Sequence, residues 1–239
     1  MNTNTKEICI VETADWDAIT FDYWGTLVDV DRSGIDAMRH VCAVLGLARL
    51  DPSALYLEWD QATVRRYRSD TWRPYLEWAA LGLRDVLEAK GGALDEGGWV
   101  ELADTLVTRM TAHAQPHPEV PAVISTLRER VPLMPITNMD DAYFQLNPFH
   151  GEFDRYLTAQ QAGAFKPSAR IFERAIEQLG VPPGRILHVS MSAFADLEGA
   201  MPVGMKVAWI NRTQQALGPY TPRPLYEFPN LRGVELLFA

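Results

Sequence analysis

The sequence predicts an α/β fold in which a parallel sheet, with helices on both faces, contains an inserted all-helical block. Two observations lead to this prediction. Downstream of a proline-rich connection near residue 118, short apolar runs alternate with helical patterns, as in parallel sheets built from strand–helix–strand units. Upstream, from Ser33 to about His113, apolar residues recur at three- and four-residue steps and no strand pattern interrupts them.

The first strand is a short apolar run, Ile19 to Phe21, that ends in the carboxylate of Asp22. Gly25 follows and supplies the backbone freedom that a sharp reversal needs. Asp22 is therefore expected at the carboxyl end of a strand, where open parallel sheets bind their ligands. A carboxylate there can attack an electrophilic carbon or phosphorus, whereas a structural Asp at this position would only cap the loop.

The helical block divides at proline, glycine and capping residues. Asp51-Pro52 resembles an N-cap with a first-turn proline and predicts a helix to about Arg68. A helix over 71–90 is expected to end at Gly91-Gly92, and another is expected over 99–112. The stretch 115–121 contains three prolines and predicts a stiff connection.

The alternating region after this connection predicts the rest of the sheet. Strands are expected over 133–137, 153–158, 185–190 and 206–210, helices over 122–130, 168–179 and 196–201, and a short strand with a closing helix over 226–237.

Composition excludes several classes of function. The chain has 239 residues with 22 Lys and Arg against 31 Asp and Glu, a net charge of −9, and no basic run that would follow phosphates. Nucleic acid is therefore not an expected partner. No apolar stretch approaches the ~18 residues of a membrane helix, and Met1–Glu12 lacks a signal-peptide layout, so a cytoplasmic protein with no membrane partner is expected. Cys9 and Cys42 predict neither a disulfide framework nor a metal site.

Three further polar stretches end strands or begin helices: Thr137-Asn138, Lys166-Pro167, and Ser190 to Asp196. With Asp22, in this order, they resemble the four motifs of the haloacid dehalogenase-like superfamily. The segments 158–167 and 207–212 resemble its 2-haloacid dehalogenase branch. The resemblance implies a Rossmann-like core formed by residues 1–32 and 119–239, a helical cap at 33–118, and an active site between them.

The resemblance also implies roles for seven residues. Asp22 would be the nucleophile, and Lys166 would keep it anionic and oriented. Thr26 and Thr137 would donate hydroxyl hydrogen bonds, and Asn138 would donate from its amide. Ser190 and Asp196 would support the lysine and position the hydrolytic water.

Two positions distinguish the expected chemistry from that of the superfamily's Mg²⁺-dependent phosphatases. Trp24 stands where those enzymes have a second Asp as general acid, and Met191 where they have an acidic metal ligand. A thioether is a poor ligand for Mg²⁺. The expected enzyme is therefore a hydrolase without metal or other cofactor, acting on the carbon–halide bond of a small 2-haloalkanoic acid. Asp22 would form an ester with the substrate, and water would release a 2-hydroxy acid.

Five residues are expected to contact the substrate: Tyr23, Trp24, Asp60, Arg66 and Phe172. Trp24 would form a wall of the pocket, and Phe172 stands where the family has a tyrosine. In the family, an arginine that follows a Trp in the second cap helix usually contacts the halide. Here the corresponding Trp59 is followed by Asp60. Arg66, or its neighbours Arg65 and Arg68, could substitute.

Several alternatives stay open. Asp60 would repel a halide and favour an ammonium, which allows ring opening as in the related azetidine-2-carboxylate hydrolase. A Mg²⁺-dependent phosphatase and a non-catalytic relative are the others. The resemblance also allows a homodimer. His113 and His117 are expected at the surface rather than on a metal, His188 packed in its strand, and Asp140-Asp141 capping the helix that follows.

Overall fold

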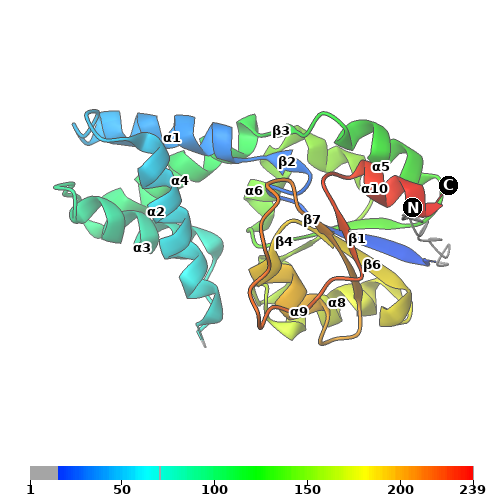
Figure 1. Ribbon diagram of the computed structural model, residues 1–239. Helices are drawn as coiled ribbons and strands as arrows, with labels where there is room; N and C mark the ends of the chain where they lie inside the picture. Colours follow the sequence, from blue (N-terminus) through cyan, green and yellow to red (C-terminus); the bar gives the residue numbers. More distant parts are fainter. Residues whose placement is uncertain (1–15, 70, 239) are drawn as a thin grey trace, which may run out of the picture.

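The computed structural model describes residues 16–69 and 71–238. Met1–Glu12 and Cys9, on which part of the expected localisation depended, lie outside the described residues. A bundle of helices forms one side of the molecule in Figure 1, and a sheet with helices above and below it forms the other. The predicted α/β class is therefore confirmed.

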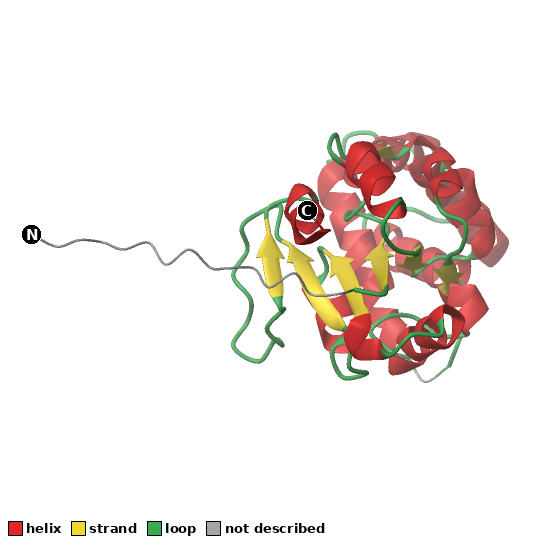
Figure 2. Cartoon of the chain, turned by 90° about the vertical axis from the view of Figure 1, so that its right-hand side faces the viewer, coloured by secondary structure: helices red, strands yellow, loops and turns green. Residues whose placement is uncertain are grey.

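The described part of the chain contains a six-stranded parallel sheet, whose strands run side by side in Figure 2. Its order is β5-β4-β1-β6-β7-β8, so the strand that ends in Asp22 lies between two neighbours near the middle. All carboxyl ends meet at one edge, as the sequence predicts. The strands are β1 (Ala18–Asp22), β4 (Leu133–Thr137), β5 (Leu157–Thr158), β6 (Ile186–Ser190), β7 (Lys206–Ile210) and β8 (Tyr226–Phe228).

Helices bury both faces of this sheet (Figure 1). Phe21 and Leu27 pack with side chains of α5 and α10 on one face, and Ile136 and Ile186 pack with side chains of α8 on the other. The helices of this part are α5 (Val120–Arg128), α6 (Asp141–Leu146), α7 (Ala159–Ala162), α8 (Ala169–Leu179), α9 (Glu198–Ala200) and α10 (Arg232–Glu235), with 3-10 turns at Pro148–Glu152, Pro183–Arg185 and Leu236–Phe238.

Two predicted elements are shorter than expected. The strand expected over 153–158 is reduced to Leu157–Thr158, because the Thr158 hydroxyl already accepts the Gln161 N–H as N-cap of α7. The helix expected from Asp196 is preceded by a single π-helical turn, Ala193–Leu197, in which the Ser192 hydroxyl accepts the N–H of Ala195. Asp196 lies in this turn, and its carboxylate accepts a hydrogen bond from Ser190 at the end of β6.

The inserted block forms its own apolar core from α1 (Asp31–Val44), α2 (Pro52–Val64), the 3-10 turn η1 (Arg65–Arg68), α3 (Tyr75–Glu88) and α4 (Glu96–His113). The Asp51 cap of α2 is confirmed, since its carboxylate accepts the Ser53 N–H at 3.0 Å. Helix α4 begins earlier than the predicted Trp99. Asp95 accepts the Gly98 N–H at 2.7 Å, so the two glycines lie inside the first turn.

A short antiparallel ribbon connects the two parts. Strand β2 (Val28–Asp29) leaves the sheet side and pairs with β3 (Gln115–Pro116), which returns to it (Figure 1). The predicted proline-rich connection therefore includes a strand that the sequence pattern does not reveal. The exact domain boundaries, 32/33 and 118/119, stay a prediction.

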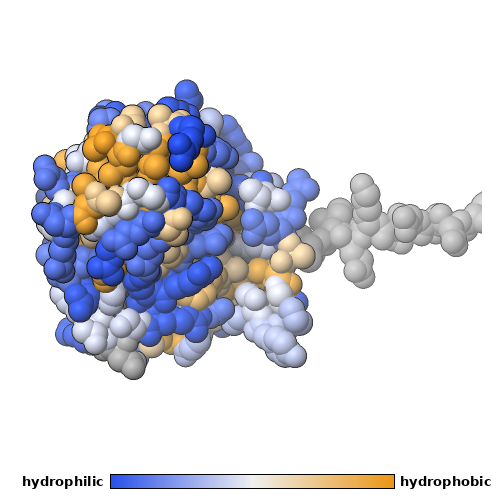
Figure 3. Space-filling model, turned by 90° about the vertical axis from the view of Figure 1, so that its left-hand side faces the viewer, coloured by the Kyte–Doolittle hydropathy of each residue, from blue (hydrophilic) through white to orange (hydrophobic). Residues whose placement is uncertain are grey.

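Within the described ranges, no helix is both long and apolar enough to cross a bilayer. Figure 3 views the molecule from the end formed by the helical block, where apolar surface gathers over one part of an otherwise polar face. The exposed large apolar side chains of this block include Val44, Leu57 and Val100. The homodimer that the resemblance allows stays a prediction.

Candidate active site

Asp22 is the last residue of β1, and both of its carboxylate oxygens accept short hydrogen bonds. The ammonium of Lys166 donates to Oδ1 at 2.6 Å, and the Thr26 hydroxyl donates to Oδ2 at 2.6 Å. The positive φ of Gly25 (82°) turns the chain so that Thr26 reaches back over the strand end. Only 7% of Asp22 is exposed, so these two donors are the main polar environment of the carboxylate.

Lys166 lies between two carboxylates. Its Nζ is 2.6 Å from Asp22 and 2.9 Å from Asp196, and only 1% of the residue is exposed. Burial disfavours the charge on Lys166, but the carboxylates of Asp196 and Asp22 outweigh it and raise the pKa of the lysine. The lysine thus remains an ammonium next to the expected nucleophile.

The two carboxylates differ in their environment. Burial raises the pKa of Asp22, and the nearby charge of Asp196 adds to this effect against the opposing pull of Lys166 and Thr26. Burial acts in the same direction on Asp196, but Lys166 and a hydrogen bond from His188 lower its pKa to about 2. Asp196 is therefore the permanent counter-charge of Lys166, and Asp22 is the more basic carboxylate.

A buried chain of hydrogen bonds fixes Asp196. Ser190 donates to its Oδ2 at 2.7 Å, and the His188 Nε2 lies 2.8 Å from its Oδ1. The other ring nitrogen of His188 lies 2.8 Å from the Thr20 hydroxyl. His188 is packed in its strand as expected, but the sequence did not reveal that it orients the counter-charge of the lysine.

Thr26 and Asn138 each contact the backbone of a neighbouring motif. The Thr26 hydroxyl accepts the N–H of Met191 at 2.9 Å. The Asn138 amide accepts the Lys166 N–H at 2.7 Å and donates to the Lys166 carbonyl at 3.1 Å. Asn138 therefore fixes the lysine segment, and its expected donation to a substrate stays a prediction. Thr137 is buried, and its hydroxyl has no hydrogen-bond partner among the described residues.

A cavity of about 300 Å³ lies above Asp22, between the sheet edge and the helical block. Asp22, Lys166 and Asn138 form its floor. The remaining lining residues are Trp24, Gly25, Val30, Asp31, Tyr56, Trp59, Asp60, Val64, Tyr67, Tyr75, Met110, Met139, Met191, Ser192 and Ala195.

Trp24 and Asp60, both expected to contact the substrate, line this cavity. Tyr23 does not, and this expectation is wrong. Adjacent strand residues point to opposite faces, so Asp22 faces the cavity while Tyr23 enters the apolar core. There the Tyr23 hydroxyl donates to Asn147 at 2.8 Å and its ring packs on Phe144.

Arg66 and Phe172 are also not among the residues that line the cavity. The Arg66 guanidinium turns to Asp85 on α3, at the surface of the helical block. Phe172 lies on the inner face of α8 and packs edge-on against His188, with ring centroids 5.4 Å apart. Both expectations fail because sequence spacing does not give the direction of a side chain.

The sequence missed four polar residues of the cavity: Asp31, Tyr56, Tyr67 and Tyr75. Asp31 begins α1 just beyond the ribbon, and the tyrosines lie on or between α2 and α3. Burial, together with the charge of Asp31, raises the pKa of Asp60 to about 6. The signal available in the sequence was the clustering of tyrosines around Trp59-Asp60.

Asp140 also departs from its expected role. It precedes α6, but its carboxylate makes no cap bond to that helix. Its two oxygens instead accept the N–H groups of Tyr75 and Leu76, the first two residues of α3. Asp141 accepts the hydroxyl of Thr158 at 2.6 Å. The core thus caps a helix of the inserted block.

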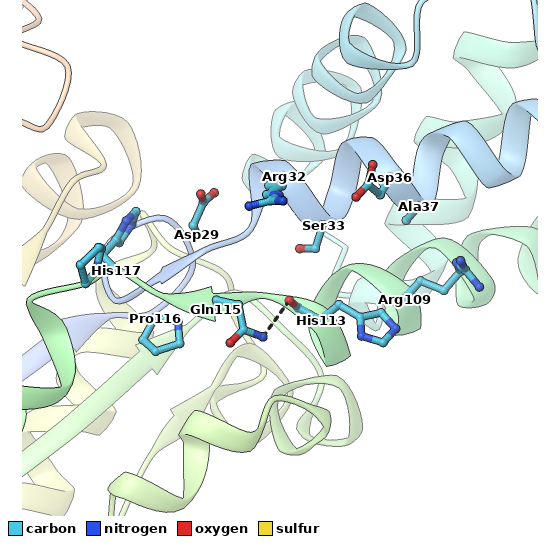
Figure 4. A pocket seen from close by; sticks show the side chains of 11 residues that line it. Asp29, Arg32, Ser33, Asp36, Ala37, Arg109, His113, Gln115, Pro116 and His117 are labelled. Atoms are coloured by element: carbon cyan, nitrogen blue, oxygen red, sulfur yellow. Dashed lines mark hydrogen bonds between the residues drawn. The ribbon is translucent and has the colours of Figure 1, made fainter.

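A second cavity, of about 530 Å³, lies beside the β2–β3 ribbon and contains none of the Asp22 constellation (Figure 4). His113 is exposed, and the backbone of Gln115 separates it from His117. The His117 Nε2 lies 2.9 Å from the carbonyl oxygen of Gly25, so this ring contacts the turn that follows the nucleophile.

The lining of the Asp22 cavity is a poor match for a divalent cation. In residues 16–69 and 71–238, no three His, Cys, Asp or Glu side chains converge as a metal-binding group. Met191 presents its sulfur to the Gly25 turn, so closely that a Cβ at Gly25 would lie 2.5 Å from it. Mg²⁺ requires oxygen ligands, which this side chain lacks.

Comparisons with known proteins agree with this geometry. The family model of haloacid dehalogenase-like hydrolases matches residues 16–204, so the chain belongs to this family. It is 27% identical over 204 residues to (S)-2-haloacid dehalogenase H-109 of Pseudomonas putida, covering 82% of this chain and 86% of the relative. A pyrimidine 5'-nucleotidase of Escherichia coli is 25% identical over 211 residues, with 82% and 86% coverage.

The fold is that of L-2-haloacid dehalogenase from Xanthobacter autotrophicus, solved with chloropropionic acid covalently bound. The TM-score is 0.79 at 21% identity, with 93% of this chain and 98% of the other covered. The predicted superfamily and the Rossmann-like core with a helical cap are confirmed. Members of the predicted 2-haloacid dehalogenase branch are among the hydrolases to which the chain is similar.

Proposed function

We propose that the protein is a metal-independent hydrolase in which Asp22 displaces a leaving group from a saturated carbon. The observation that supports this most directly is the placement of Asp22 on the floor of the cavity, between the Lys166 ammonium and the Thr26 hydroxyl. The leaving group proposed from the family is the halide of a small 2-haloalkanoic acid. The (S)-2-haloacid dehalogenase relative supports that choice.

The reaction has two steps. An Asp22 oxygen attacks C2, the carbon–halogen bond breaks, and the halide leaves with the bonding electrons. Water then adds to the carbonyl carbon of the aspartyl ester and the ester bond breaks. The products are a 2-hydroxy acid, regenerated Asp22 and a proton released to solvent.

The chain's own residues fit both steps. Lys166 and Thr26 orient the attacking carboxylate, which the raised pKa of Asp22 makes more nucleophilic while the ammonium keeps it ionised. The same ammonium is positioned to stabilise the oxyanion that forms when water attacks the ester. His188 and Ser190 act through Asp196, which holds the lysine in place.

A phosphatase is the second candidate, because one relative is a nucleotidase. An alkoxide leaving group needs a proton, and Trp24 cannot supply it, whereas a halide leaves without one. Met191 likewise replaces an oxygen ligand by sulfur. These two positions favour displacement at carbon.

The test is intact-mass spectrometry of EDTA-treated protein during turnover of 2-chloropropionate, fluoroacetate and azetidine-2-carboxylate. An adduct that maps to Asp22, with product released without metal, is expected for at least one compound. A single turnover in H₂¹⁸O should place ¹⁸O in Asp22, because water attacks the ester carbonyl.

The matched variants are Asp22→Asn and Asp154→Asn, which change the same group in the cavity and at the exposed surface. Only the first should lose adduct and product. Turnover of an aryl phosphate that requires Mg²⁺, with no adduct from the three acids, would overturn the proposal in favour of a phosphatase.

A further inference from the structure

The charges around the Asp22 cavity do not suit a purely anionic substrate. Among the described residues that line it are three carboxylates, Asp22, Asp31 and Asp60, but a single cationic side chain, Lys166. Lys166 is already within 2.9 Å of two carboxylates. No arginine is among the described residues that line the cavity.

The two arginines on either side of Tyr67 are engaged elsewhere. Arg66 forms an ion pair with Asp85, and Arg68 pairs with Glu198 and covers the ring of Phe194 at 4.5 Å. The carboxylate of a simple 2-haloalkanoate would therefore enter a cavity whose uncompensated charges are negative.

Asp60 is the group best placed to recognise the opposite charge. It lies on α2, is largely buried at the cavity wall, and makes no hydrogen bond or ion pair within the described residues. A buried carboxylate without a partner is costly unless a ligand supplies one. Asp31, on α1, adds a second negative charge at the exposed rim of the same cavity.

Aromatic rings form much of the remaining wall around Asp60. Tyr56 and Trp59 lie 5.8 Å apart, and Tyr67 stacks on Phe165 at 4.7 Å, which fixes its plane. Tyr75 lies on α3 at the opposite side. Ring faces attract cations, and this attraction adds to that of a nearby carboxylate.

We propose that this cavity binds its substrate through a protonated nitrogen held by Asp60 and the surrounding rings. The substrate class is then a small ammonium compound with a leaving group on saturated carbon, rather than a simple 2-haloalkanoic acid. This inference rests on the proposed function, because it places the ammonium in the cavity whose floor is Asp22. It concerns recognition and adds no chemical step.

The test measures binding of two probes of opposite charge to the intact protein by titration calorimetry at low ionic strength. Isopropylammonium and isobutyrate carry the same isopropyl group on a cationic and an anionic head. Isopropylammonium is expected to bind at least tenfold more tightly. Tetramethylammonium shows whether the N–H groups are needed in addition to the charge.

The matched variants lie on the same helix. Asp60→Asn removes the proposed contact, and Glu58→Gln removes an equal charge that faces outward and contacts Lys90 at 3.4 Å. Only Asp60→Asn should lower the affinity for isopropylammonium, by tenfold or more. Equal affinities for the two probes, or an unchanged affinity in Asp60→Asn, would overturn the inference.

These outcomes separate the two proposals. Asp22 adducts from 2-chloropropionate without binding of isopropylammonium would leave the proposed function in place and remove the ammonium site. Charge-selective binding that depends on Asp60, with no adduct from any compound, would leave the ammonium site in place and remove the displacement reaction.

Discussion

The carboxylate of Asp140 accepts a hydrogen bond from the backbone N–H of Tyr75 at 3.0 Å, across the junction between the sheet and the helical cap. Its other oxygen accepts the Leu76 N–H at 3.2 Å, so a residue of the core caps helix α3. Tyr75 also lines the cavity. The start of α3, which contributes to the cavity wall, is therefore anchored to the core by the carboxylate of Asp140.

Replacing Asp140 by Ala should weaken this junction. Two N–H groups at the start of α3 would lose their acceptor, which costs about 1 kcal/mol for a typical N-cap. We expect that decrease in the free energy of unfolding, measured with urea, and a higher KM with a smaller change in kcat. Asp140→Asn keeps an acceptor and should stay close to the wild type. Equal losses in the two variants would contradict the capping role.

Replacing Thr26 by Val should affect both rate and stability. The variant loses the hydrogen bond to Asp22 and leaves the partly buried N–H of Met191 without the Thr26 acceptor. We expect kcat to fall about 10- to 100-fold and unfolding free energy to fall by about 1–3 kcal/mol. Thr26→Ser retains the hydroxyl and should recover most of the rate. A Ser variant as slow as the Val variant would point to packing alone.

Replacing Lys166 by Met should impair ionisation of Asp22. Without the ammonium, two buried carboxylates face each other, so both become harder to ionise. The acidic limb of the pH–rate profile should move to higher pH, with kcat reduced on the order of 10³-fold. Stability should fall by about 3–5 kcal/mol, as when a buried pair is broken.

Two further variants make this experiment decisive. Lys166→Met with Asp196→Asn removes both opposing charges and should regain stability without regaining the rate. Lys90→Met changes an exposed lysine and should leave the profile unchanged. An acidic limb at the wild-type position in Lys166→Met would show that the ammonium does not control Asp22.

The raised pKa of Asp60 predicts a specific dependence of stability on pH. Its pKa is 3.8 in the unfolded reference and about 6 in the fold, because of burial and the charge of Asp31; Tyr56, Tyr67 and Tyr75 also face it. Between these values the folded state binds more protons than the unfolded state at Asp60. The stabilisation of the fold by this proton is therefore fully present below pH 3.8 and is lost as pH rises through about 6.

Asp60→Asn should therefore be more stable than the wild type at pH 7.5, and this difference should shrink at pH 4. The expected change in the difference is on the order of 1–3 kcal/mol, measured by urea unfolding at both values. Glu58→Gln, on the outer face of α2, should show no such change. A difference that is constant with pH would rule out a raised pKa at Asp60.

The sequence predicts the core and the nucleophile motif well because both depend on local patterns. Asp22 could be located because it ends an apolar run. The other three motifs could be located from their order along the chain. The start of a helix in the inserted block was also predictable where an N-cap residue such as Asp51 precedes it. The cavity was predicted less well, because its walls come from helices whose relative rotation depends on packing.

Particular residues illustrate this limit. Tyr23 does not line the cavity because its side chain points to the opposite face of the strand from Asp22. Arg66 does not line it because the carboxylate of Asp85 on α3 attracts its guanidinium. Asp31 was missed because no motif contains it, and only the turn after the ribbon brings it to the cavity rim. His188 looked like packing and is also a hydrogen-bond partner of Asp196.

The ribbon between β2 and β3 has a consequence for how the chain folds. Asp29 and Gln115 are register partners although the whole helical cap separates them in sequence. Once the cap has formed and the ribbon is paired, only short stretches remain between β1 and its neighbour β4. The loss of chain entropy on joining these central strands is then much smaller than their separation in sequence suggests. Formation of the cap should therefore accelerate assembly of the sheet.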